Sequence, residues 1–229
     1  NSMKKTLMTI LVSGLMLASC SKQEVSDNPL LQKWDTPFET APFEKIKVEH
    51  YLPAFEAAIA EHNKEIQAII DNAEAPTFDN TIAALDYSGE TLSKVAGVFF
   101  NMMAANTSEE LQKVNEKVGP LMATHSDNVS MNAKLFEKIK AVYDAKDSQK
   151  YTGEQLALLE KTYNKFVRSG ALLDAAKQEG LRKVNAELTK VESKFDANLL
   201  KESKAYQLVI DKEENLKGLP QGEIEKAAA

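Results

Sequence analysis

Residues 52–71 have the sequence LPAFEAAIAEHNKEIQAIID, in which apolar side chains recur every three or four positions. This spacing places them on one face of an α-helix, with the charged residues on the opposite face. The apolar face consists of Leu52, Phe55, Ile59, Ile66 and Ile69. Proline is common in the first turn of a helix, so we expect this helix to begin at Pro53, after a short turn over residues 47–52.

Five later segments carry the same apolar spacing, and each predicts another amphipathic helix. They cover residues 82–102, 111–129, 135–143, 156–167 and a stretch of about 30 residues that begins at Asp174. Capping-box patterns at residues 107–110 (TSEE) and 152–155 (TGEQ) predict two of the starts. Pro120 should kink or shorten its helix, and Gly170 should end the helix that precedes it. The sequence therefore predicts a mainly α fold.

The C-terminal region contains one stretch that predicts a strand, YQLVI at residues 206–210. No other segment of the sequence has the pattern of a strand that would pair with it. A buried strand with unpaired backbone N–H and C=O groups is destabilised. We therefore expect this strand to lie on the surface or to pair with something outside the chain. A last helix is predicted from about Glu223, six residues before the end of the sequence. Both features favour a truncated chain.

The composition excludes several classes of function. The chain has 229 residues, 43% of them hydrophobic, which suffices for a globular core without a metal or disulfide to stabilise it. Its formal net charge of −6 argues against a nucleic-acid-binding protein, which needs clustered lysine and arginine. The single cysteine excludes an internal disulfide framework and a multi-cysteine metal site.

The N-terminus has the pattern of a bacterial lipoprotein signal. Lys4 and Lys5 precede an apolar stretch at residues 7–17, which is shorter than the roughly 20 residues that a membrane-spanning helix needs. The following residues, LASC at positions 17–20, are similar to a lipobox, whose cysteine is lipidated. We predict a signal peptide at 1–19, lipidation at Cys20, a tether at 20–32 and a helical domain at 33–229.

This N-terminal pattern predicts a lipid-anchored protein of the bacterial cell envelope, on the periplasmic side or at the cell surface. Two alternatives are an ordinary secretory signal in which the cysteine is incidental, and an N-terminal hydrophobic helix.

Residues that carry catalytic chemistry are scarce. A helical zinc peptidase needs two histidines four positions apart with a glutamate between them, and His50, His62 and His125 do not have that spacing. His62 and His125 lie within apolar stripes, which favours core histidines with one hydrogen-bonded nitrogen over ligand contacts. His50 is expected at the surface or in a turn.

Two further patterns contain residue types that occur in functional sites. Residues 125–127 (HSD) are triad residue types, but adjacent side chains on a helix point apart and cannot form a triad. The run FFNMM at 99–103 would suit either a peptide cleft or, more commonly, core packing. The candidate channel-lining residues are Phe99, Phe100, Asn101 and His125.

Several motifs in series are similar to the thimet oligopeptidase family, which includes the peptidyl-dipeptidases and oligopeptidase A. They are FEKIKVEHYLPAF at 43–55, APTFDNTI at 75–82, VFFN at 98–101, ATHSD at 123–127, LLEKTY at 158–163, FVRSG at 166–170 and LKGLP at 216–220. The resemblance therefore extends from about Asn28 to the last residue.

The resemblance implies a helical, two-lobed zinc peptidase whose channel admits short peptides. Family members hold zinc with the two histidines of an HExxH helix and a later glutamate, all in their C-terminal part. None of these residues matches a position here, so no catalytic or metal-binding residue is carried over to this chain. The chain would correspond to the N-terminal helical lobe, which forms one wall of the channel.

Two functions follow as expectations. In the first, the chain is the N-terminal part of a lipid-anchored zinc oligopeptidase or peptidyl-dipeptidase, inactive by itself. Its partners would be short peptides, a missing C-terminal catalytic domain and the membrane. In the second, the chain is a stand-alone helical envelope lipoprotein that acts as a peptide-binding or interaction module.

Overall fold

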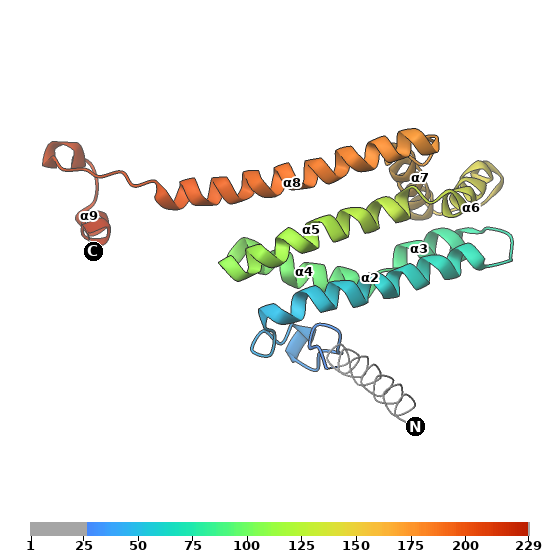
Figure 1. The fold of residues 1–229 in the computed structure, drawn as a ribbon, viewed down its shortest axis with the longest axis horizontal. Helices are drawn as coiled ribbons and strands as arrows, with labels where there is room; N and C mark the ends of the chain where they lie inside the picture. Colours follow the sequence, from blue (N-terminus) through green and yellow to red (C-terminus); the bar gives the residue numbers. More distant parts are fainter. Residues whose placement is uncertain (1–26, 229) are drawn as a thin grey trace, which may run out of the picture. The chain divides into compact units, whose positions relative to one another are not determined.

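The computed structural model describes residues 27–228, and this part of the chain is mainly α-helical (Figure 1). Its helices are α2 (Val48–Asp71), α3 (Ala84–Tyr87), α4 (Glu90–Ala105), α5 (Glu109–Ser130), α6 (Ala133–Asp144), α7 (Gly153–Arg168), α8 (Ala175–Ala205) and α9 (Gln221–Ala228). Short 3-10 or π-helical turns occupy Pro37–Glu39, Phe78–Ala83, Lys146–Ser148 and Glu213–Leu216. The predicted mainly α class is confirmed. The predicted signal peptide (1–19) and Cys20 lie outside the described residues.

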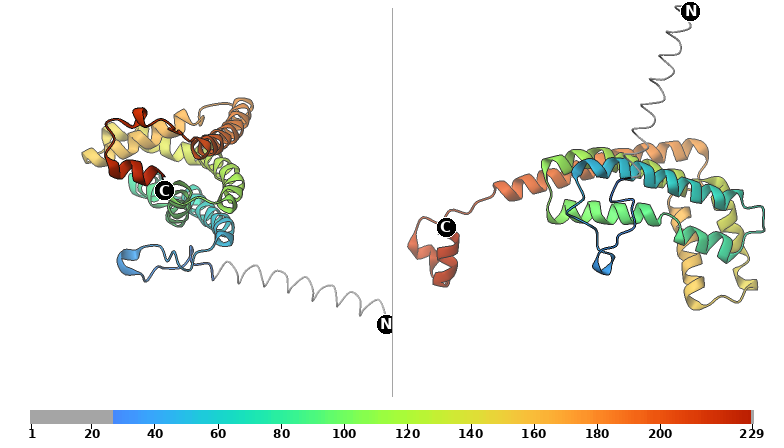
Figure 2. Two further views of the ribbon diagram at one scale, coloured as in Figure 1. Left: turned by 90° about the vertical axis from the view of Figure 1, so that its left-hand side faces the viewer. Right: turned by 90° about the horizontal axis from the view of Figure 1, so that it is seen from below.

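The described residues divide into two compact units, the first ending at Lys190 and the second beginning at Val191, with the boundary inside α8. In the first unit, α2 packs against α4 and α5, and α6 packs against α7 (Figure 2). Within residues 27–228, no helix is both long and apolar enough to cross a membrane.

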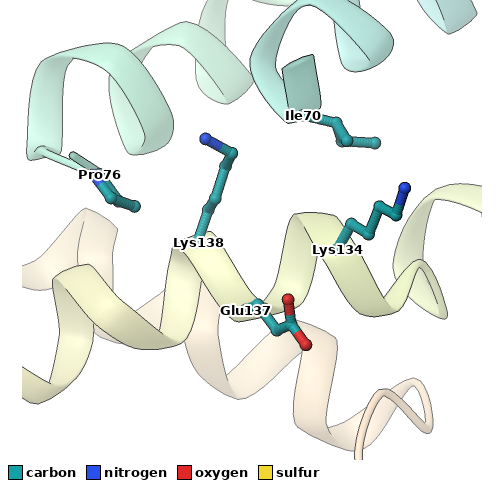
Figure 3. Close-up of a pocket in the computed structure, with 5 residues that line it drawn as sticks. All are labelled: Ile70, Pro76, Lys134, Glu137 and Lys138. Atoms are coloured by element: carbon teal, nitrogen blue, oxygen red, sulfur yellow. The ribbon is translucent and has the colours of Figure 1, made fainter. Parts of the chain in front are cut away.

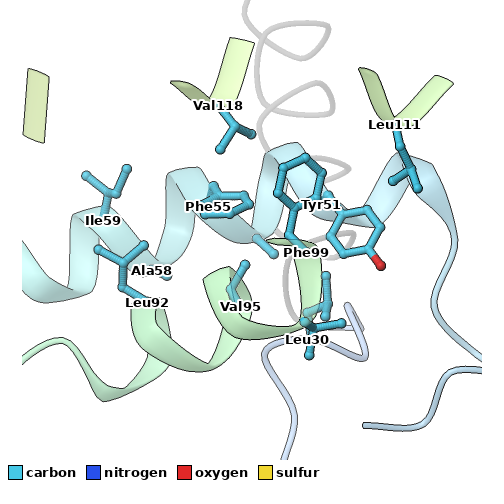
Figure 4. Packing of buried hydrophobic residues seen from close by; sticks show 12 residues of the cluster. Leu30, Tyr51, Phe55, Ala58, Ile59, Leu92, Val95, Phe99, Leu111 and Val118 are labelled. Atoms are coloured by element: carbon cyan, nitrogen blue, oxygen red, sulfur yellow. The ribbon is translucent and has the colours of Figure 1, made fainter. Parts of the chain in front are cut away.

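Helix α2 contributes to two separate apolar clusters. Its N-terminal half packs Tyr51 and Phe55 edge-to-face against Phe99 of α4, with ring centroids 5.1 and 5.4 Å apart (Figure 4). Its C-terminal half places Ile66 and Ile69 in a second cluster with α6 and α7. Because both clusters share one helix, the stretch of α2 between them is held from both ends.

The packed domain begins earlier than the sequence suggests. Leu30, which falls in the predicted tether, is fully buried in the first cluster. Asn28 donates a hydrogen bond from Nδ2 to the carbonyl of His50 at 2.8 Å, and Trp34 donates from Nε1 to the carbonyl of Pro29 at 2.9 Å. A polar segment with two adjacent leucines has no helical or strand period, although these contacts fix residues 28–31 against the helices.

The start of α2 also differs from the expectation. The helix begins at Val48 and not at Pro53, so the predicted turn over residues 47–52 is wrong. The backbone N–H of Lys47 donates to Nδ1 of His50 at 3.0 Å and satisfies one amide at the helix start. Pro53 is therefore inside the helix, where it lacks the N–H that would bond to the carbonyl of Glu49.

The predicted helix over residues 82–102 is broken into parts. A π-helical turn at Phe78–Ala83 leads into α3, and the chain then bends at Ser88 and Gly89 before α4 begins. Gly89 has φ of +75°, a conformation that glycine adopts without a steric penalty. The apolar stripe continues across the break, so the periodicity alone did not reveal it.

The remaining helix boundaries follow the sequence signals closely. Thr152 and Gln155 form the predicted capping box, and Gly170, at φ of +96°, follows the end of α7. The predicted capping box at residues 107–110 is wrong, because Thr107 does not cap α5 and instead donates from Oγ1 to Sδ of Met103 at 3.7 Å. The cap is Ser108, whose Oγ accepts from the N–H of Leu111 at 3.2 Å. Helix α5 runs for 22 residues through Pro120, so the proline does not shorten it.

The predicted strand at residues 206–210 is wrong, because within residues 27–228 the chain forms no strand. These side chains are exposed, from 39% for Ile210 to 79% for Val209. A strand needs a neighbouring strand for its backbone hydrogen bonds, and the described residues supply none. The apolar residues of this segment indicate a side-chain preference for strands, but they do not indicate whether a partner strand is present.

Candidate functional site

Two histidines from different helices meet between the two apolar clusters. His62 of α2 and His125 of α5 lie with Nδ1 and Nε2 2.9 Å apart, and their ring planes are inclined by 63°. His125 is buried, and His62 is half-buried. The contact joins side chains that are 63 positions apart in the sequence.

The surrounding hydrogen bonds determine which nitrogen of each ring carries a proton. The hydroxyl of Ser88 donates to the carbonyl of Leu85 at 2.7 Å, so its oxygen accepts from Nε2 of His62 at 3.1 Å. Nδ1 of His62 is then a bare acceptor and receives the proton on Nε2 of His125. In the neutral pair, Nδ1 of His125 is left without a proton.

Nδ1 of His125 is accessible from the adjacent pocket. Every fully buried side-chain nitrogen or oxygen in the described part of the chain has a hydrogen-bond partner, and Nδ1 of His125 has none. This atom therefore reaches space that solvent or a ligand can occupy. The chain of hydrogen bonds from His125 through His62 and Ser88 to the Leu85 carbonyl is open at one end.

The pocket has a volume of about 380 Å³ and both polar and apolar walls. Its lining residues are His62, Leu85, Asp86, Ser88, Leu92, Met122, His125, Ser126, Val129, Ser130, Thr162, Lys165 and Phe166. They come from α2, α3, α4, α5 and α7 and from the bend between α3 and α4. Apolar walls with a few converging polar groups are typical of small-ligand sites.

Gly89 lets the bend approach the His62 ring closely. A Cβ atom at this position would lie 3.1 Å from Cε1 and Nδ1 of His62, tighter than most van der Waals contacts. The N–H of Gly89 also donates to Oε2 of Glu65 at 2.7 Å. The bend between α3 and α4 is therefore fixed against α2 one turn after His62.

Burial keeps the two imidazoles neutral near pH 7. It lowers the pKa of His62 below its usual value, and the nearby Glu65 carboxylate offsets part of that effect. Burial likewise lowers the pKa of His125, and the neighbouring His62 lowers it further. Two positively charged rings in this position would repel each other, so the pair is most stable with no added proton.

The structure separates the four predicted channel-lining residues. Phe99 is fully buried in the first apolar cluster and does not line the His62–His125 pocket. Phe100 is 44% exposed, and Asn101 is exposed, with its Nδ2 donating to the carbonyl of Gly97 at 2.7 Å. Of the four predicted residues, only His125 lines that pocket. Whether any of the four lines a peptide channel stays a prediction.

Residues 125–127 do not converge on one another. Ser126 is exposed, whereas Asp127 is buried and accepts from Nδ2 of Asn185 in α8 at 2.8 Å. Sequence reasoning placed His62 and His125 on separate apolar stripes but missed their pairing. A histidine within each of two such stripes was the available signal.

A second pocket lies between the C-terminal end of α2, the following loop and α6 (Figure 3). Its lining residues are Ile70, Pro76, Lys134, Glu137 and Lys138, and its volume is about 380 Å³. Nζ of Lys138 donates to the carbonyl of Asn72 at 2.7 Å. Flexible charged side chains form most of its wall, so the histidine pocket is the better-defined site.

Residues 27–228 contain no group of three or more His, Cys, Asp or Glu side chains placed to hold a metal ion. The sequence also lacks the pair of histidines four positions apart on which the family's zinc site depends. The zinc site that the resemblance implies therefore does not fit the residues that the structure describes.

The sequence of these helices is similar to parts of known proteins. Residues 55–178 match the family model described as "Neurolysin/Thimet oligopeptidase, N-terminal domain". A dipeptidyl carboxypeptidase of Salmonella typhimurium is 37% identical over 204 residues, which cover 89% of this chain and 30% of the relative. The Escherichia coli dipeptidyl carboxypeptidase is 35% identical over 201 residues, covering 88% and 30%.

A probable cytosolic oligopeptidase A of Arabidopsis thaliana is 26% identical over 200 residues, which cover 87% of this chain and 28% of that protein. The chain thus spans about 30% of the length of the curated relatives that it matches. The matched residues 55–178 include α4 to α7, both histidines of the pair and Gly89.

Proposed function

Because the chain belongs to the thimet oligopeptidase family, we propose that it is the N-terminal helical part of a zinc-dependent peptidase that hydrolyses short peptides. The observation that carries this proposal is the match of residues 55–178 to the N-terminal domain of the family. Two relatives, at 37% and 35% identity, are dipeptidyl carboxypeptidases, so release of dipeptides from peptide C-termini is the activity proposed for the complete protein.

In this proposal the helices contribute a wall of the substrate channel and no catalytic group. Residues 27–228 hold no group that fits the zinc implied by the family, so no step of peptide hydrolysis is assigned to them. Their contribution would be steric: rigid packed helices exclude folded proteins and admit extended peptides. Catalysis is assigned to residues outside this chain.

The surface of α8 supports a larger assembly. In the first unit α8 contacts α5 through polar residues, since Arg182 donates to Oδ1 of Asn128 at 3.0 Å and Asn185 donates to Asp127. Its apolar stripe is more than half exposed at Val184, Leu188, Val191, Phe195 and Leu199. Exposed apolar surface of this extent is typical of an interface with another protein segment.

The lipid anchor belongs to the same proposal. Acylation at Cys20 would attach the peptidase to the bacterial cell envelope, where it would act on short peptides. The part of the predicted tether before Asn28 would join the anchor to the packed domain.

The test is peptide hydrolysis by the protein that the complete reading frame encodes. We expect an HExxH helix in that frame and release of dipeptides from short peptides. A chelator should abolish the activity, and Zn²⁺ should restore it. A frame without HExxH, or hydrolysis that survives complete removal of metal, would contradict the proposal and favour a stand-alone lipoprotein module.

A further inference from the structure

We propose that His62 and His125 form a binding site for one divalent transition-metal ion, with Zn²⁺ as the ion to test. The ion would bind Nδ1 of His62 and Nε2 of His125, the two nitrogens that face each other at 2.9 Å. The inference does not depend on the peptidase proposal. The residues come from α2 and α5 of the first unit.

The distance between the two nitrogens suits a shared metal. Zinc–imidazole bonds are about 2.0–2.1 Å long, so two nitrogens on one ion lie about 2.9–3.4 Å apart for angles of about 90° to 110°. The observed 2.9 Å falls at the short end of that range. Because the donor N–H and the acceptor nitrogen of a hydrogen bond point at each other, the ion would lie along the free electron pair of His62 Nδ1, and the His125 ring must turn away from that line to bind it.

Metal binding displaces the proton that lies between the two rings. Binding breaks the hydrogen bond from Nε2 of His125 to Nδ1 of His62 and forms two nitrogen–metal bonds. The proton leaves Nε2 of His125, and Nδ1 of the same ring, which is open to the pocket, takes up a proton from solvent. Each imidazole stays neutral, so the exchange is balanced without a net release of protons.

The far nitrogen of His62 already has the partner that metal-bound histidines usually have. Its Nε2–H donates to the Ser88 oxygen, which fixes the tautomer with Nδ1 free for a metal. The close approach of Gly89 restricts movement of the same ring. These contacts orient His62 before an ion arrives, which lowers the entropic cost of binding.

The pocket can supply the rest of the coordination shell. The described residues give no third histidine, cysteine or carboxylate in a binding group, so water would complete the shell. A volume of about 380 Å³ holds several water molecules, each of which occupies about 30 Å³ in the liquid. Asp86 and Lys165 also line the pocket, and Glu65 lies one turn from His62, so charges of both signs surround the site.

The experiment is calorimetric titration of the purified 229-residue chain with Zn²⁺ after removal of metal by a chelator. We expect one ion per chain with a dissociation constant of about 1–100 μM. His62→Gln and His125→Gln should each weaken binding at least about tenfold, whereas His50→Gln should leave it unchanged. Equal binding by the H62Q/H125Q variant and the unchanged chain, or no binding by the unchanged chain, would overturn the proposal.

A second measurement does not depend on the folding of any variant. Long-range ¹H–¹⁵N spectra of the histidine rings in the unchanged chain identify the nitrogen that binds metal. We expect Zn²⁺ to shift Nδ1 of His62 and Nε2 of His125, with His50 unaffected. A shift confined to His50, or no shift at either predicted nitrogen, would refute the site.

Discussion

At the scale of single residues, two features of the structure favour glycine at position 89. Its φ of +75° is unfavourable for other residues, and a Cβ atom there would lie 3.1 Å from the His62 ring. Gly97 in α4 provides a matched comparison, because a Cβ atom there would have no neighbour within 4 Å. Alanine substitutions at the two positions therefore distinguish two effects on stability. One is the effect of backbone strain and close contact at Gly89, and the other is the ordinary cost of glycine inside a helix.

We predict that Gly89→Ala lowers the free energy of unfolding by about 1–3 kcal/mol, through strain at positive φ and the contact with His62. Gly97→Ala should leave it unchanged or raise it by up to about 1 kcal/mol, because alanine favours a helix interior. Urea unfolding followed by circular dichroism measures both values. Equal effects of the two substitutions would count against the close packing described for Gly89.

The His62–His125 pair predicts a dependence of stability on pH. Burial lowers the pKa of both residues in the folded chain, so the unfolded chain binds more protons once the pH falls below about 6.5. With a chelator present, the free energy of unfolding should decrease from about pH 7.5 to about pH 5.5.

Most of that decrease should disappear in the H62Q/H125Q variant and remain in His50→Gln. Urea midpoints at several pH values measure it. A double variant that keeps the full decrease would show that the pair is not its source.

For the same residues, the sequence predicts the position on each helix but not the contacts between helices. The apolar stripes located His62 and His125, because a helical period places each among its own neighbours. Their contact joins positions 63 apart and depends on how α2 and α5 pack, which local periodicity does not encode. The role of Gly89 was missed for the same reason, since its φ and its contact with His62 arise from packing between helices.

At the scale of elements, the existence of the helices was predictable and several boundaries were not. The capping box at Thr152 and the glycine at 170 are local signals, and both predicted ends agree with α7. The start of α2 at Val48 instead uses the ring of His50 as an acceptor, a role for which the sequence gives no common pattern. The false strand at 206–210 shows that a side-chain preference does not supply a pairing partner.

The apolar side chains of α7 and α8 should differ in their effect on stability. Phe166 is 3% exposed in the second cluster, whereas Phe195 on α8 is 64% exposed. We predict that Phe166→Ala lowers the free energy of unfolding by about 3–5 kcal/mol. Phe195→Ala should change it by less than about 0.5 kcal/mol. A large loss at Phe195, measured by urea unfolding, would mean that the α8 stripe is already covered.

At the scale of the whole molecule, one cysteine should decide where the protein is found. We predict that the unchanged protein and a Ser21→Ala control incorporate labelled fatty acid and sediment with membranes in a bacterial host. Cys20→Ala should lose both properties, because the acyl chains supply the attachment. Unchanged sedimentation and labelling of Cys20→Ala would refute the lipobox prediction.

Family and fold class were predictable for the whole molecule because they rest on many short motifs in series. The motifs at 75–82, 98–101, 123–127, 158–163 and 166–170 all fall within the matched residues 55–178. The catalytic chemistry was not predictable from site residues, since the chain has three histidines and no HExxH spacing. Its proposed role therefore depends on what the helices enclose together with the rest of the protein.

The central claim is that these helices shape a peptide channel without supplying the hydrolytic site. The most direct test is a peptidase assay of the purified 229-residue chain with short peptides and added Zn²⁺, followed by mass spectrometry of the products. The account predicts intact peptides, including at Zn²⁺ concentrations that saturate the His62–His125 site. Release of dipeptides that a chelator abolishes would contradict it, because the hydrolytic centre would then lie within this chain.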